Sequence, residues 1–268
     1  MACCLSKPPI RRAATRFGTH LRSAASPASP GPPRRRTLLV ADPPTPFRRL
    51  KCAALEVAWI QASDPANQID ILSGSDASRD KVLTALPNAT VAHFCTHGNF
   101  DTADPFQSRL LLANGEPLAL DTLLPILNNS KLSEVVLSAC ETAVVPSWRF
   151  ADELLGFPAA LLSHGAATVI ASQWPVDDLA AAALMGEFYR QWRTPPGKSP
   201  AQALHVAQSW LRNVSADELY NLVDPFTKAP NPLGSLAADV RTLLFAKDPE
   251  EKPFDHPYYW AAFTVSGI

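Results

Sequence analysis

The chain has 268 residues, 47% of them hydrophobic, and a formal net charge of −1 at neutral pH. This length and apolar content allow a sizeable buried core in one or two domains. The nearly balanced charge argues against a nucleic-acid or lipid-surface partner, and no apolar run reaches the roughly 20 residues that a membrane-spanning helix needs.

The first 36 residues differ in composition from the rest. They carry lysine and arginine but no acidic residue, and serine, proline and glycine dominate positions 26–33. Such a segment cannot bury enough apolar surface to offset its ordering entropy, so we predict a disordered basic tail over 1–36. A mitochondrial presequence is the alternative, since presequences are rich in arginine and poor in acid. The prolines suit a presequence helix badly, and we expect a cytoplasmic protein.

Strands and helices are predicted to alternate from residue 37 onward. Short apolar runs beside turn residues predict strands, and apolar residues at helical spacing predict helices. In the first half we predict strands at 38–40, 69–72, 91–95 and 110–112, and helices at 53–60, 78–86 (with Ser78 as N-cap) and 118–127. In the second half we predict strands at 135–137, 167–172 and 260–265, helices at 152–163, 180–192 and 200–211, and a looser stretch over 213–256.

This alternation indicates an α/β fold. Buried strands joined by helices form right-handed βαβ units, which give a mostly parallel sheet with helices on both faces, a three-layer sandwich. In such sheets the chemistry lies at the carboxyl ends of the strands. The folded domain is therefore predicted over 37–268.

Two predicted strands end in reactive side chains. One ends in His97-Gly98 and the other in Cys140. If the two strands are neighbours, an imidazole and a thiol meet at one sheet edge, which is what a cysteine nucleophile and its base need. The backbone N–H groups of Gly98 and Cys140 are candidate oxyanion donors.

The five cysteines do not suggest disulfides or zinc. Their number is odd and their spacing fits neither a disulfide framework nor paired CxxC knuckles. We therefore expect reduced thiols in an intracellular compartment. A zinc site at His93 and His97 is disfavoured because residues four apart on a strand lie about 13 Å apart. His93 is interpreted as structural, and no metal or other cofactor is expected.

Four stretches of the sequence resemble the CHAT domain family. They are His93-Phe94-Cys95-Thr96-His97-Gly98, Leu137-Ser138-Ala139-Cys140-Glu141-Thr142, residues 171–178 and residues 256–263. The resemblance implies a caspase–hemoglobinase-like fold related to caspases and separases. It also implies a cysteine peptidase of protein or peptide substrates, with His97 and Cys140 at the positions of the catalytic dyad. Family members are commonly regulated by tetratricopeptide repeats, so such a segment or protein is an expected partner.

Two interpretations stay open from sequence. Asp177 and Asp178 lie between a strand and a helix, where they either cap the helix or form an acidic S1 pocket for a basic P1 side chain. The whole domain is either a peptidase or a catalytically inactive scaffold that binds partners through the same cleft. An α/β nucleotide-binding domain is disfavoured because neither glycine-rich phosphate motif is present.

Overall fold

The computed structural model describes residues 35–63, 68–99, 101, 107–138, 158–194 and 197–268. Its centre is a six-stranded sheet of order β2-β1-β3-β7-β8-β9. The strands are β1 (Arg36–Ala41), β2 (Gln68–Ser73), β3 (Val91–Cys95), β7 (Glu134–Ser138), β8 (Thr168–Ser172) and β9 (Phe263–Gly267). The first five are parallel and β9 is antiparallel to β8, so the predicted mostly parallel sheet is confirmed.

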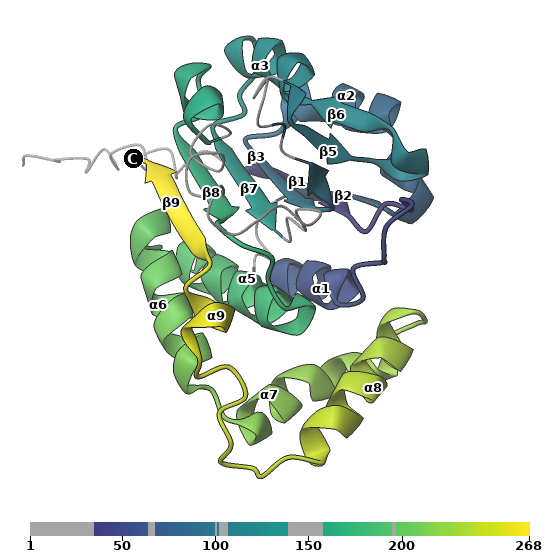
Figure 1. Cartoon of the computed structure of the whole chain (residues 1–268), viewed down its shortest axis with the longest axis vertical. Coiled ribbons are helices and arrows are strands. Elements are labelled where there is room, and N and C mark those ends of the chain that lie inside the picture. The colour runs from purple at the N-terminus through teal and green to yellow at the C-terminus, as the bar shows by residue number, and fades with distance from the viewer. Residues whose placement is uncertain (1–34, 64–67, 100, 102–106, 139–157, 195–196) are drawn as a thin grey trace, which may run out of the picture. The chain divides into compact units, whose positions relative to one another are not determined.

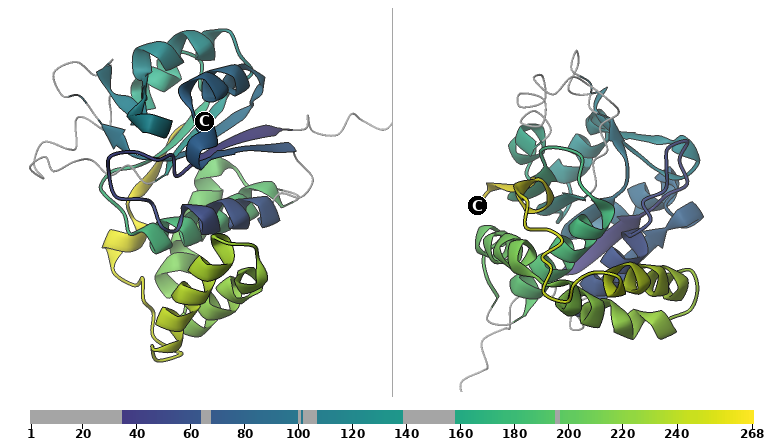
Figure 2. Two further views of the ribbon diagram at one scale, coloured as in Figure 1. Left: turned by 90° about the vertical axis from the view of Figure 1, so that its right-hand side faces the viewer. Right: turned by 60° about the horizontal axis from the view of Figure 1, so that its bottom comes forward.

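Helices cover both faces of this sheet, as Figures 1 and 2 show. One face packs against α1 (Ala53–Ser63), α5 (Asp178–Arg193) and α6 (Pro200–Asn213). The other packs against α2 (Arg79–Ala85), α3 (Leu120–Asn128) and the helix over 158–163. The architecture is therefore the predicted three-layer α/β sandwich, with one apolar core on each side of the sheet.

A second, smaller sheet follows β3 directly. It is antiparallel and consists of β4 (Gly98–Asn99), β5 (Arg109–Leu111) and β6 (Pro117–Ala119). The helix predicted from residue 118 begins instead at Leu120, because Pro117–Ala119 pairs with β5. This small sheet leaves β3 at the point where the predicted catalytic histidine lies, and the Leu111 amide donates to the His97 carbonyl over 2.8 Å.

The prediction of a looser stretch over 213–256 is wrong. It contains α7 (Ala216–Val223) and α8 (Leu233–Phe245), joined by a 3-10 helix over Asp224–Lys228. Ser215 and Glu218 form a capping box at the start of α7. Of the five prolines in this stretch, three lie between the two helices, at 225, 230 and 232, and two follow α8, at 249 and 253, so none lies inside either helix.

The C-terminal prediction is partly wrong as well. Residues Pro257–Trp260 form a short helix, α9, and β9 begins only at Phe263. The helix predicted over 152–163 is described from residue 158, and it ends where predicted, before Gly165 with its φ of +108°. Within the described ranges, no helix is both long and apolar enough to cross a membrane.

Candidate active site at the carboxyl edge of the sheet

The two strands that precede the predicted catalytic residues are direct neighbours. β3 and β7 pair in parallel, with Cys95 opposite Ser138 at their carboxyl ends. His97 follows Cys95 by two residues, and Cys140 follows Ser138 by two. Cys140 itself lies outside the described residues. The structure thus describes one half of the predicted pair and the strand that leads to the other half.

His97 is held by the backbone of the loop between β1 and α1. Its side chain is nearly buried, with 4% of the residue exposed, and its Nε2 lies 2.7 Å from the Arg48 carbonyl oxygen. The Phe47 ring packs against it at a centroid distance of 5.5 Å. A carbonyl only accepts hydrogen bonds, so Nε2 carries a hydrogen and Nδ1 is the acceptor of the neutral ring. The contact therefore selects one tautomer.

The same loop is fastened to the end of β3 by Asp42. The Asp42 amide donates to the Cys95 carbonyl over 3.0 Å. Its side chain accepts from the Leu50 amide at 3.2 Å and from Arg49 Nε at 2.9 Å. Asp42 has φ of +43°, a backbone conformation that aspartate tolerates better than most residues. These contacts hold the loop in place on both sides of Arg48.

Gly98, the predicted oxyanion donor next to His97, is buried and begins β4 opposite Leu110. The hydroxyls of Ser138 and Ser172 lie at the same edge, at the ends of β7 and β8. Both are buried, and neither has a hydrogen-bond partner in the part of the chain that the structure describes.

The two predicted S1 carboxylates lie at the start of α5. Asp177 is the N-cap: its Oδ1 accepts from the amides of Leu179 at 3.1 Å and Ala180 at 3.0 Å. Asp178 Oδ2 accepts from the Lys51 amide at 3.0 Å, which ties α5 to the loop that holds His97. The capping interpretation is therefore confirmed for Asp177, and an S1 role for either carboxylate stays a prediction.

His93 belongs to a buried polar network between the sheet and the helices. Its Nε2 lies 2.7 Å from Glu56 Oε1 on α1, and its Nδ1 lies 3.2 Å from the Tyr189 hydroxyl on α5. Cys95 Sγ donates to Glu56 Oε2 at 3.4 Å. Burial, reinforced by the Glu56 charge, raises the pKa of Cys95 well above its ordinary value. The structural interpretation of His93 is confirmed.

Sequence reasoning missed Glu56 and Arg48. Glu56 is a single acid inside the otherwise apolar run Ala53–Ile60, and that contrast is a signal that a buried partner exists. Arg48 acts through its backbone carbonyl, for which no residue type is a signal. Across the described ranges, no group of three His, Cys, Asp or Glu side chains is placed to hold a metal ion.

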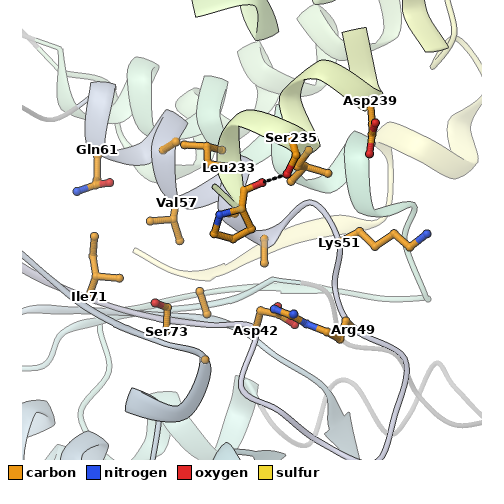
Figure 3. A pocket seen from close by; sticks show the side chains of 17 residues that line it. Asp42, Arg49, Lys51, Val57, Gln61, Ile71, Ser73, Leu233, Ser235 and Asp239 are labelled. Carbon is orange, nitrogen blue, oxygen red and sulfur yellow. Dashed lines mark hydrogen bonds and ion pairs between the residues drawn. The ribbon is translucent and has the colours of Figure 1, made fainter. Parts of the chain in front are cut away.

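A cavity of about 700 Å³ opens beside the loop between β1 and α1 (Figure 3). Its walls come from α1, the ends of β1 and β2, and α8. Val57, Ile71 and Leu233 contribute apolar surface, and Arg49 and Lys51 are on the side of the loop. The cavity was not foreseen because one of its walls is α8, which the sequence analysis missed.

Comparisons with known proteins give one family and several distant structures. The crystal structure of the Drosophila initiator caspase Dronc is 12% identical, with 68% of this chain and 74% of that chain covered and a TM-score of 0.39. A structure described as a protease is 14% identical, covers 88% of this chain and 47% of that one, and has a TM-score of 0.38. Pyridoxal kinase from Staphylococcus aureus is 9% identical over 67% of this chain and 87% of its own, with a TM-score of 0.34.

A search of curated proteins finds no match. The family model of the CHAT domain, in contrast, matches residues 7–268, nearly the whole chain. The match begins within the segment predicted to be a tail, and residues 1–34 lie outside the described residues. It includes both the His97-Gly98 strand end and the Cys140 motif, and from it we conclude that the chain belongs to the CHAT domain family.

Proposed function

We propose that the protein is a cysteine endopeptidase in which Cys140 is the nucleophile and His97 the general base. The pairing of β3 with β7, with Cys95 opposite Ser138, is the observation that carries this proposal. Neighbouring strands lie about 4.8 Å apart. Two further residues on each chain span at most about 7 Å. Residues two positions beyond paired strand ends can therefore approach closely enough for an imidazole to hydrogen-bond a thiol, and the proposal requires that His97 and Cys140 do so.

The tautomer of His97 fits the role of base. Because the Arg48 carbonyl keeps the hydrogen on Nε2, Nδ1 is the nitrogen that takes the thiol proton. The thiolate then attacks the scissile carbonyl carbon, and backbone N–H groups at Gly98 and Cys140 stabilise the oxyanion. Nδ1–H gives its proton to the leaving amine as the peptide C–N bond breaks. Water, deprotonated by His97, hydrolyses the resulting thioester and restores the thiol.

A peptide probe that alkylates active-site thiols tests this proposal. Wild-type protein should be labelled stoichiometrically and should cleave peptides, and Cys140→Ala and His97→Ala should lose both properties by roughly 1,000-fold or more. Cys52→Ala is the matched control. Burial raises the pKa of Cys52 to about 12, so its thiol holds little thiolate at neutral pH and its removal should leave labelling unchanged.

Labelling that persists in Cys140→Ala would contradict the dyad. A folded wild-type protein with neither labelling nor cleavage would favour an inactive scaffold instead. Wild-type protein that is labelled but cleaves no peptide from a diverse library would retain the dyad and leave endopeptidase activity without support.

We further propose that Asp177 and Asp178 select a basic P1 side chain. Their position at the end of β8 and the start of α5 puts two carboxylates at the same sheet edge as His97. Asp177→Asn and Asp177→Ala separate this role from helix capping, because asparagine caps as well as aspartate whereas alanine costs about 1 kcal/mol. If the charge selects the substrate, both variants should lose the preference for arginine-ending over aspartate-ending peptides, because both lose the charge. If only the cap matters, Asp177→Asn should keep that preference. Equal cleavage of the two peptides by wild type would refute the proposal.

A further inference from the structure

The buried network of Glu56, His93, Cys95 and Tyr189 joins three elements at one place. Glu56 lies on α1, His93 and Cys95 on β3, and Tyr189 on α5. Glu56 and Cys95 are each 2% exposed, His93 is 1% exposed and Tyr189 is fully buried. Buried polar groups cost free energy of folding unless their hydrogen bonds are satisfied. Here the hydrogen bonds connect α1 to β3 and β3 to α5.

The Glu56 carboxylate accepts at both oxygens. Oε1 faces His93 Nε2 at 2.7 Å, and Oε2 accepts from the Cys95 thiol at 3.4 Å. A carboxylate only accepts in this arrangement, so Nε2 of His93 carries the hydrogen. The two donors are at alternate positions of β3, and the carboxylate between them therefore fixes the position of α1 along the strand.

The chain that leads into α1 contacts the same strand a second time. Arg48 precedes α1 by five residues, and its carbonyl accepts the His97 Nε2–H bond at 2.7 Å. His97 follows Cys95 by two residues, beyond the end of β3. The α1 segment thus binds β3 and its extension twice, through the Glu56 side chain and through the Arg48 backbone. A shift of α1 along β3 would move the Arg48 carbonyl relative to the His97 ring.

The packing of α1 against α5 allows little compensation. A Cβ at Gly186 of α5 would lie 2.7 Å from the Trp59 Cβ of α1, so the two helices are in close contact. The Lys51 amide also donates to Asp178 at the start of α5. The position of α1 is therefore set jointly by α5 and by the Glu56 network.

We propose that Glu56 is a positioning residue for His97, acting through His93 and Cys95 on the placement of α1 and the Arg48 carbonyl. The proposal rests on the proposed peptidase function for its kinetic consequence, but its structural consequence is independent of activity. Glu56 touches neither substrate nor the reacting atoms. It keeps His97 in the single tautomer whose Nδ1 is available to the thiol.

Glu56→Gln tests the proposal with little change of volume. An amide accepts at one oxygen only, so at one of the two contacts, to His93 or to Cys95, an amide N–H replaces the carboxylate oxygen that accepted in the wild type. ¹⁵N NMR of histidine-labelled protein at about pH 8 reports the tautomer, with the His97 signals identified by their loss in His97→Asn. Wild type should show a single Nε2–H tautomer at His97, and Glu56→Gln should show a mixture. The kcat for peptide cleavage should fall roughly 10- to 100-fold with KM changed by about twofold at most.

Glu187→Gln is the matched control. Glu187 is a second buried carboxylate, 8% exposed, on α5, and it accepts from Arg190 and Gln191 on its own helix. Its replacement should lower the melting temperature as Glu56→Gln does. It should leave the His97 tautomer and kcat unchanged. If a general loss of stability caused the changes in Glu56→Gln, Glu187→Gln would show them too.

Three outcomes separate the possibilities. A His97 tautomer unchanged in folded Glu56→Gln would overturn the positioning role even if the wild type is an active peptidase. A wild type without peptidase activity, together with a shifted tautomer in Glu56→Gln, would refute the proposed function and retain the positioning role. If Glu56→Gln does not fold, Cys95→Ala removes one of the two donors to Glu56, and an unchanged His97 tautomer in that variant would equally overturn the inference.

Discussion

The two faces of the central sheet differ in chemistry. Toward α1 and α5, the buried residues of β1, β3, β7 and β8 include six with polar side chains or thiols: Thr37, His93, Cys95, Ser138, Thr168 and Ser172. Toward α2 and α3, the buried side chains of the same four strands are all apolar: Leu38, Val40, Ala92, Phe94, Val135, Leu137, Val169 and Ala171. Burial alone does not explain this difference, because the residues named on both faces are buried.

The difference shows how the protein uses two kinds of packing. Apolar contact is non-directional and tolerates small shifts of a helix over a sheet. Hydrogen bonds fix distance and direction within a few tenths of an ångström. The helices of the apolar face are needed for stability, whereas α1 is held in register with β3, and α1 follows the loop that contacts His97.

The largest expected effect comes from the apolar face. Phe94 is 1% exposed, and Phe94→Ala removes a large side chain from the core. It should cost about 3–5 kcal/mol of unfolding free energy, measured by urea denaturation. In the fraction that stays folded, the His97 tautomer should be unchanged. A tautomer change as large as that in Glu56→Gln would show that the two faces do not differ in the way proposed.

An alkaline pH dependence should come from the other face. Burial, followed by the charges of Asp178 and Asp177, raises the pKa of Cys52 to about 12. In the unfolded chain this thiol has its ordinary pKa of 9.0, so the unfolded state loses its proton first. Stability is therefore full below about pH 9 and falls as the pH rises toward 12.

Cys52→Ala provides the comparison for this pH effect. Other groups also titrate at high pH, so the informative quantity is the difference in unfolding free energy between the variant and wild type. That difference should shift in favour of Cys52→Ala from pH 8 to pH 11. Parallel stability curves for the two proteins would show that Cys52 does not keep its proton in the folded state.

The smallest expected effect concerns a polar side chain without a partner. Ser172 is 1% exposed and its hydroxyl makes no hydrogen bond within the described ranges. Ser172→Ala removes a buried unsatisfied group and should raise the unfolding free energy by about 1 kcal/mol. A loss of stability would mean that the hydroxyl has a hydrogen-bond partner in solution, such as a buried water.

Much of the fold was predictable from local pattern. The five parallel strands follow from short apolar runs that end at turn residues, as in Val91–Cys95. The α7 and α8 helices were missed because prolines at 225, 230 and 232 suggested irregular chain, although the capping box at Ser215 and the apolar spacing Ala237–Val240–Leu244 were visible. Prolines that lie between two helices were interpreted as evidence that the whole stretch is irregular.

The site was predictable only in part. His97 was found because a reactive residue at a strand end is a recognisable pattern, and Cys140 remains a prediction beside the described strand β7. Glu56 could not be placed because its partners are 37 and 39 residues away along the chain. Which pairs of distant residues meet is decided by the packing of α1 on β3, and that packing is not encoded in any short stretch.

The carbonyl of Arg48 has a consequence for how this family is compared across genomes. Every residue has a backbone carbonyl, so the identity of the residue at position 48 carries no signal for this contact in a sequence alignment. Substitutions at position 48 should leave the contact between its backbone carbonyl and His97 intact. Insertions or deletions between Asp42 and Cys52 should not, since it is the spacing of the peptide units that evolution has to preserve.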